Sequence, residues 1–193
     1  MSAPGPTGTL RERKRHEARL RTVDAALELF ARDGFAAVTV DEICAAAEIA
    51  PRTFFRYFPA KEDVLFAPLD ALAVEALSLV ADAPAGDGAT ILAEVFRELA
   101  ARSVAEGGRV LQASRIVAES DALRLSPGAL LTARERALAE ALHDRGAGEG
   151  GPPWRTRLVV ARSVAVFRLW LEAARSTDPD DPLALYDAIA ADA

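Results

Sequence analysis

The sequence has few of the residues that build covalent or metal-bound sites. Among 193 residues there are one cysteine, Cys44, and two histidines, His16 and His143. A single cysteine excludes an internal disulfide framework and a zinc site made from paired cysteines. No serine, histidine and aspartate stand in a sequence pattern that is typical of a catalytic triad either. We therefore predict no metal, no cofactor and no catalytic residue, so the chain is not expected to be an enzyme.

Long hydrophobic runs are also missing. The best candidate extends from Val64 to Ala81 and is interrupted by Asp70 and Glu75, whereas a membrane-spanning helix needs about 20 apolar residues. The basic N-terminus has no apolar stretch behind it, which is unlike a signal peptide. These features predict a cytoplasmic protein that does not bind a membrane.

Charge is distributed unevenly along the chain. The net charge is −6, and all of it belongs to residues 64–193, where thirteen arginines face nineteen acidic residues. Residues 1–63 are neutral overall, yet the segment from Arg11 to Arg21 holds six basic and two acidic residues. The simpler interpretation of such a run alone is a solvated helix face. A basic arm on an acidic body instead indicates two separate roles, one of them with a polyanion.

Nearly every segment favours helix, because alanine, leucine and arginine dominate and β-branched residues never alternate with polar ones over a strand length. We predict an all-α fold. Residues 1–10 contain two prolines and two glycines and are expected to be disordered. Pro68 is expected to kink or restart the helix that contains it. The expected helices run from Leu10 to a stop at Gly34, then over Val40–Ala47, Pro51–Phe58, from Lys61 to about Ala81, Thr90–Glu106, Arg109–Ala118, Pro127–Arg145, Trp154–Ser176 and Pro182–Ala191, with a linker at Gly146–Pro153.

Two short helices form a helix-turn-helix pattern. Thr39 and Glu42 have the spacing of a capping box, which starts the first helix, and Pro51 suits the first position of the second. Phe54 and Phe58 share one face of the second helix, and we expect both to be buried. Its remaining side chains can donate to base edges or phosphates; they are Arg52, Thr53, Phe55, Arg56 and Tyr57.

The segment Thr39–Leu65 reads TVDEICAAAEIAPRTFFRYFPAKEDVL and resembles the signature of TetR/AcrR-type transcriptional regulators. The preceding ALELFARDGFAAVTV extends the resemblance, which covers about Arg11 to Phe66. The resemblance implies a three-helix DNA-binding domain over residues 11–60 and a helical ligand-binding and dimerisation domain over 61–193. It places the contacts to phosphates and bases on Thr39, Arg52, Thr53, Phe55, Arg56, Tyr57 and Lys61.

Three positions depart from the family pattern around the turn. Glu48 stands where glycine is usual, and Ala50 and Ala60 stand where serines often cap helices. A left-handed glutamate costs on the order of 1 kcal/mol, and a missing cap costs about 1 kcal/mol. Phe55 also stands where tyrosine is frequent, so one hydroxyl is lost. Whether these changes weaken DNA binding is left open by the sequence.

The resemblance further implies a homodimer formed through the last two helices, a palindromic double-stranded operator and a small-molecule effector. The segment TFFRYFPAKEDVLFA is most similar to an actinobacterial branch that includes mycofactocin-type regulators, for which an acyl-CoA-like effector is implied. Another hydrophobic or aromatic effector is the alternative. Repression is expected, although the sequence does not separate repressor from activator. Candidate ligand-lining residues are Phe96, Leu99, Ser103, Gln112, Arg115, Phe167 and Trp170, each of which also fits an ordinary bundle core.

The sequence also allows two other interpretations. Gly146–Gly151 formally satisfies G-x-G-x-x-G, but a helix precedes it and two prolines follow, so it indicates a loop rather than a dinucleotide site. The rival function is a helical small-molecule-binding or protein-interaction module that lacks DNA recognition, and only the departures from the family pattern support it.

Overall fold

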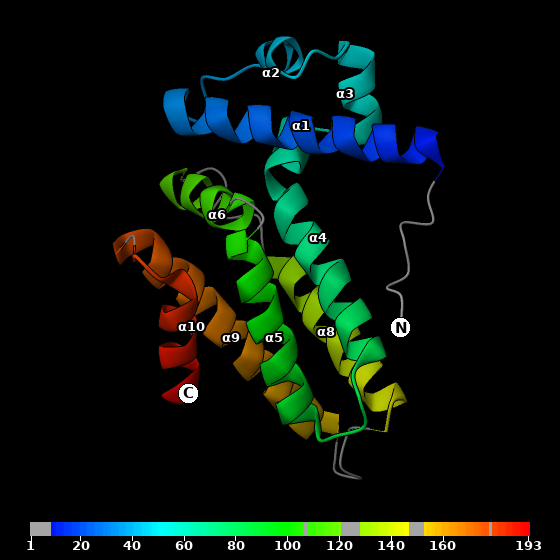
Figure 1. Cartoon of the computed structure of the whole chain (residues 1–193), viewed down its shortest axis with the longest axis vertical. Helices are drawn as coiled ribbons and strands as arrows, with labels where there is room; N and C mark the ends of the chain where they lie inside the picture. The colour runs from blue at the N-terminus through cyan, green and yellow to red at the C-terminus, as the bar shows by residue number, and fades with distance from the viewer. Residues whose placement is uncertain (1–8, 106–107, 121–127, 147–152, 178) are drawn as a thin grey trace. The chain divides into compact units, whose positions relative to one another are not determined.

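A computed structural model describes residues 9–105, 108–120, 128–146, 153–177 and 179–193. Within these ranges the chain forms nine helices and no strand (Figure 1), which confirms the all-α prediction. The chain divides into two compact units, one ending at Ala67 and the other beginning at Pro68. The helices are α1 (Leu10–Asp33), α2 (Val40–Ala46), α3 (Pro51–Tyr57), α4 (Lys61–Asp82), α5 (Gly88–Ala105), α6 (Arg109–Glu119), α8 (Gly128–Asp144), α9 (Pro153–Thr177) and α10 (Pro182–Ala191).

Helix α4 lies where the two units meet. The helix α4 is continuous from Lys61 to Asp82 with Pro68 inside it, so of the two outcomes expected at Pro68, a kink or a restart, the restart does not occur; one missing N–H donor leaves the neighbouring helical bonds in place. The N-terminal unit ends at Ala67, so it includes the first turns of α4 with buried Val64 and Leu65. The predicted disordered tail (residues 1–10) and linker (Gly146–Pro153) lie mostly outside the described residues. Where they are described the tail differs, since Thr9 caps α1 and Leu10 begins it, and Pro153 already belongs to α9.

The N-terminal unit packs its helices around an apolar centre. Helix α1 buries one stripe, which includes Leu27 and Phe30, and ends before Gly34, whose φ of 84° suits glycine. Helix α2 adds Ile43 and Cys44. Burial raises the pKa of the Cys44 thiol, as expected of a cysteine that serves as packing rather than chemistry.

An aromatic cluster joins three helices of the C-terminal unit. The rings of Phe96 on α5 and Phe167 on α9 lie 5.7 Å apart, and Phe167 lies 5.0 Å from Trp170. Trp170 is fully buried, and its indole Nε1 donates to the carbonyl of Pro182 at 2.6 Å. Tyr186 on α10 closes the cluster, edge-on to Trp170 at 5.9 Å. The cluster therefore fixes α10 against α9 and α5.

Tyr186 should make the protein sensitive to alkali. Desolvation, followed by the neighbouring Asp187, raises its pKa to about 12, against about 10 in an unfolded chain. The neutral phenol is favoured in the folded state, so this stability is present below pH 10 and is lost as pH rises towards 12. We expect the wild type to lose about 1 kcal/mol more than Tyr186→Phe between pH 9 and pH 11 in denaturant unfolding. Equal losses in the two proteins would contradict this assignment.

The part of α4 within the C-terminal unit is held by polar contacts along its length. Asp70 pairs with Arg134 of α8, and Glu75 pairs with Arg102 of α5. The guanidinium of Arg145 donates to backbone carbonyls at the end of α4, those of Ala81 and Ala83. By length and composition α4 could cross a membrane, a test that core helices also pass. Its paired acids, together with Ala76 and Val80 in the core, make it a core helix.

Candidate nucleic-acid interface

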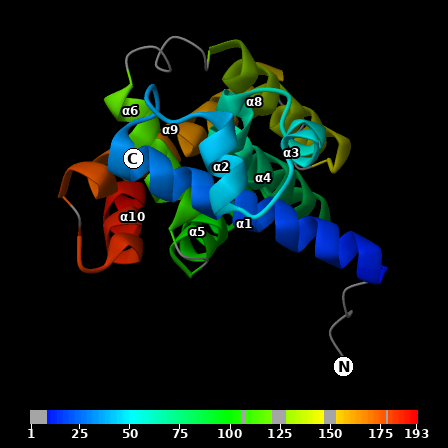
Figure 2. The same ribbon diagram turned by 90° about the horizontal axis from the view of Figure 1, so that it is seen from above.

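Helices α2 and α3 form the predicted helix-turn-helix. Figure 2 shows α2 crossing α1, and α3 follows after a turn of four residues. The turn is closed by backbone bonds, since the N–H of Ile49 donates to the carbonyl of Cys44 at 3.0 Å. Phe54 and Phe58 are buried at 0% and 1% exposure, as their spacing predicted. One face of α3 is thereby fixed to the unit, and the opposite face is left to solvent.

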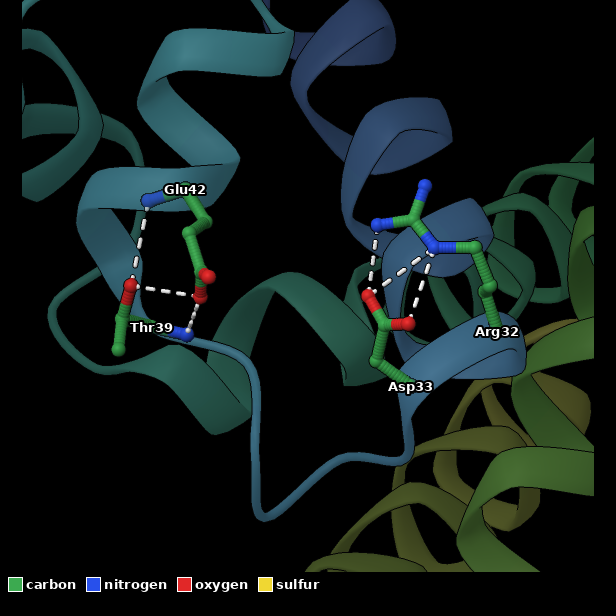
Figure 3. Close-up of polar contacts among 4 residues, drawn as sticks. All are labelled: Arg32, Asp33, Thr39 and Glu42. Atoms are coloured by element: carbon green, nitrogen blue, oxygen red, sulfur yellow. Dashed lines mark hydrogen bonds and ion pairs between the residues drawn. The ribbon is translucent and has the colours of Figure 1, made fainter.

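The start of α2 is held by the predicted capping box (Figure 3). The Thr39 hydroxyl accepts from the backbone N–H of Glu42 at 3.3 Å and donates to the Glu42 carboxylate at 2.8 Å. The backbone N–H of Thr39, and then its hydroxyl, lower the pKa of that carboxyl. Thr39 is exposed, but its hydroxyl is engaged in the cap. A phosphate would have to compete with Glu42 for it.

The outer face of α3 displays the predicted DNA-contacting side chains together. Arg52, Phe55 and Arg56 are exposed, Phe55 at 54% despite its apolar ring. Thr53 and Tyr57 flank this face and are half-buried. A short helix with two exposed arginines and an exposed phenyl ring suits the major groove, where arginine donates to guanine and an apolar group contacts the thymine methyl.

Aromatic rings at the end of α3 stack with arginines from two helices. The Tyr57 ring centroid lies 5.1 Å from the Arg56 guanidinium and 5.9 Å from that of Arg15 on α1. Arg19 of α1 stacks on Phe58 at 5.1 Å. The sequence had indicated only a basic segment at this end of α1. It contained no signal for these pairings, which depend on how α1 packs against α3.

Lys61 is placed differently from what the resemblance implied. Its ammonium donates to the carbonyls of Phe35 and Val38, both at 2.8 Å, and lies 4.4 Å from the centroid of the Phe35 ring. Two of its three donors are therefore used to tie the start of α4 to the loop between α1 and α2. Lys61 therefore helps to position the helix-turn-helix through the loop between α1 and α2, a role that the motif alone did not indicate.

Glu48 adopts the left-handed conformation, with φ of 54°. It is the only non-glycine residue with positive φ among the described residues. Replacing Glu48 with glycine should raise the free energy of unfolding by about 0.5–1 kcal/mol, because the strain is larger than the entropy that glycine adds to the unfolded chain. Denaturant unfolding measures this gain. The control is Glu48→Gln, which removes the charge and keeps the strain; an equal gain there would make charge the cause.

The two missing serine caps have different consequences. Ala50 provides no side-chain cap for α3, where Pro51 begins the helix. At Ala60 the cap is half-formed, since the Asp63 carboxylate accepts from the Ala60 backbone N–H at 2.7 Å. The missing half is a side chain at residue 60 that accepts a hydrogen bond from a backbone N–H in the first turn of α4.

Ala60→Ser should complete that capping box and raise the free energy of unfolding by about 1 kcal/mol. The matched control is Ala45→Ser, the same chemical change at an exposed position inside α2, where we expect no gain. Thermal or denaturant unfolding compares the two variants. A similar gain in both would show that capping is not the reason.

The residues predicted to line a ligand site fall into two groups. Five are buried in the C-terminal unit and are part of its helical core: Phe96, Leu99, Ser103, Phe167 and Trp170. The polar groups of Ser103 and Trp170 are already bonded, the Ser103 hydroxyl to the carbonyl of Leu99 at 2.6 Å. Gln112 and Arg115 lie half-buried on α6.

The N-terminal unit matches a known family. Residues 23–67 match the model of the bacterial regulatory proteins of the tetR family. The N-terminal unit therefore contains the N-terminal domain of the tetR family of bacterial regulatory proteins. TcmR of Streptomyces glaucescens, an HTH-type transcriptional regulator, is 41% identical over 86 residues, which are 45% of this chain and 38% of TcmR. MftR of Mycobacterium tuberculosis, which has the name of a mycofactocin biosynthesis transcriptional regulator, is 54% identical over 41 residues, 21% of each chain.

Most of the chain is similar in fold to a solved protein. FadR from Bacillus subtilis, solved in complex with stearoyl-CoA, has a TM-score of 0.62 and 21% identity, over 88% of this chain and 94% of that one. At such identity the likeness concerns the helical architecture alone. The chain spans well under two thirds of the length of TcmR and MftR, so their sequence similarity concerns the part that contains the helix-turn-helix.

Proposed function

We propose that this chain is a cytoplasmic transcriptional repressor that binds a palindromic operator as a homodimer and is released by a small hydrophobic ligand. The observation that supports DNA binding most directly is the outer face of α3, where Arg52, Phe55 and Arg56 are exposed beside half-buried Thr53 and Tyr57. The opposite face is fixed by buried Phe54 and Phe58. A rigid helix presenting base-reading groups is what major-groove recognition requires.

Dimerisation is supported by an apolar stripe on α9. Three large side chains on this helix are exposed, Trp154 at 60%, Leu158 at 62% and Leu169 at 54%. The exposed alanines Ala161 and Ala165 lie between them at helical spacing, so a second helix could approach closely. Burying this stripe in a two-fold interface would remove it from water. The two recognition helices would then contact half-sites that are one turn of the DNA helix apart, about 34–36 Å, or several turns apart.

The effector is proposed to bind among the helices of the C-terminal unit, close to the aromatic cluster and α6. The interior there is apolar, and Gln112 and Arg115 are the polar candidates at its edge. An acyl-CoA is the first candidate, because FadR from Bacillus subtilis is described with stearoyl-CoA. Other hydrophobic or aromatic molecules are the alternative. A mass spectrum of small molecules that co-purify with the protein would identify the class.

The decisive experiment is selection of duplexes from a random library by the purified protein, followed by gel shift. We expect enrichment of an inverted repeat, bound with an affinity that falls steeply with salt. Adding long-chain acyl-CoA to the complex should release the DNA. If no duplex is enriched, the protein is instead a helical binding module without DNA recognition. Enrichment of a single half-site without its repeat would contradict the dimer.

A further inference from the structure

The first turns of α1 contain more positive charge than helix stability favours. Arg11, Arg13 and Lys14 lie near the helix N-terminus, where the helix macrodipole favours acidic residues. Arg11, Arg15 and Arg19, which we call the arginine row, are also spaced four residues apart, so like charges repel along one face. None of these three pairs with a carboxylate in the part of the chain that the structure describes. An anionic partner outside the chain would explain this cost.

This segment contributes nothing to the apolar core. Residues 10–17 are all exposed, and the first buried residue of α1 is Thr22. At 1.5 Å per residue, the stretch before Thr22 is about 18 Å long. In both views the N-terminal turns of α1, in dark blue, extend past α2 and α3 (Figures 1 and 2). Core packing therefore does not account for this part of the helix.

The arginine row begins where the recognition helix ends. Arg19 stacks on Phe58, and Arg15 stacks on the Tyr57 ring that also contacts Arg56 of α3. Arg11 is one turn further out, about 12 Å along the axis from Arg19. The row is thus continuous with the proposed DNA surface and extends it beyond the end of α3. It also precedes residue 23, where the match to the family model begins.

We propose that the arginine row binds backbone phosphates of the DNA that flanks the half-site contacted by α3. Guanidinium groups bind phosphate bidentately, and duplex DNA has about one negative charge per 1.7 Å of axis. Such contacts increase affinity without reading sequence. The inference rests on the proposed DNA binding and adds a second element to it. DNA is favoured over an anionic lipid bilayer as the partner, because binding to a bilayer would not require the arginine row to adjoin α3.

The test compares Arg11→Gln/Arg15→Gln with a matched control, Arg13→Gln/Arg21→Gln. Both double variants remove the same charge from exposed positions on α1, and only the first alters the row. The probes are a duplex selected by the wild type, trimmed to its repeat, and the same duplex extended by half a helical turn on each side. Thermal unfolding confirms that both variants fold like the wild type.

On the extended duplex we expect the row variant to bind about tenfold more weakly, with a salt slope lower by about one for each lost phosphate contact. The control should stay within about twofold, and the difference should vanish on the trimmed duplex. Equal losses in both variants, or none in the row variant, would overturn the proposal. The proposal would also be overturned if the row variant lost binding to phosphatidylserine vesicles and kept its affinity for DNA. Failure of the wild type to select any duplex would instead refute the proposed function.

Discussion

A protein in which Arg52 and Arg56 are both replaced by alanine should bind its selected duplex at least about 100-fold more weakly than the wild type. Each arginine that donates bidentately to a guanine contributes about 1–3 kcal/mol of discrimination, and 1.4 kcal/mol is a factor of ten. The ratio of affinities for selected and random duplexes should fall as well, because base contacts determine specificity. Gel shifts with both duplexes at fixed salt measure both quantities.

The matched control for that experiment is Arg13→Ala/Arg32→Ala. It removes the same charge from the N-terminal unit at exposed positions outside α3. We expect it to lower affinity for selected and random duplexes equally and only slightly. Arg52 and Arg56 are exposed, so the test variant should lose little stability, at most the roughly 0.5–1 kcal/mol of the Arg56 stack on Tyr57. Wild-type specificity in the test variant would show that α3 is not the recognition helix, even if the protein selects a repeat.

The features that were predictable from sequence are those fixed by near neighbours in the chain. The capping box of α2 needs only Thr39 and Glu42, three residues apart, and it forms as expected. Phe54 and Phe58 share a face through helical periodicity alone, and both are buried. The left-handed Glu48 follows from the length of a turn that usually contains glycine. For these residues, local backbone geometry decides the outcome.

The contacts that the sequence did not indicate join segments that are distant along the chain. The Lys61 ammonium bonds to carbonyls 23 and 26 residues away, and no local pattern specifies those partners. The ligand candidates stay a prediction, and two of them already use their polar groups within the protein. A serine on an apolar face suggested a polar contact for a ligand, but the Ser103 hydroxyl bonds to the carbonyl one turn earlier. Trp170 likewise uses its indole N–H to hold the start of α10.

Lys61→Met should destabilise the N-terminal unit by about 3 kcal/mol, because two hydrogen bonds from a charged donor are lost and the carbonyls of Phe35 and Val38 lose that donor. Methionine keeps much of the apolar stem, so the loss reports on the ammonium. The chain's other lysine, Lys14, is exposed on α1 and gives the control. Lys14→Met makes the same chemical change and should alter stability by less than about 0.5 kcal/mol. Denaturant unfolding of the three proteins measures both effects.

The salt dependence of DNA binding separates this role of Lys61 from the phosphate contact that the family resemblance implied. A lysine that binds phosphate lowers the slope of log K against log salt by about one when it is removed. A lysine that ties α4 to the loop between α1 and α2 leaves the slope unchanged, at temperatures where both proteins are folded. We expect an unchanged slope together with the loss of stability. A lower slope with wild-type stability would instead make Lys61 a phosphate ligand, and its bonds to the loop carbonyls would then be exchanged for DNA upon binding.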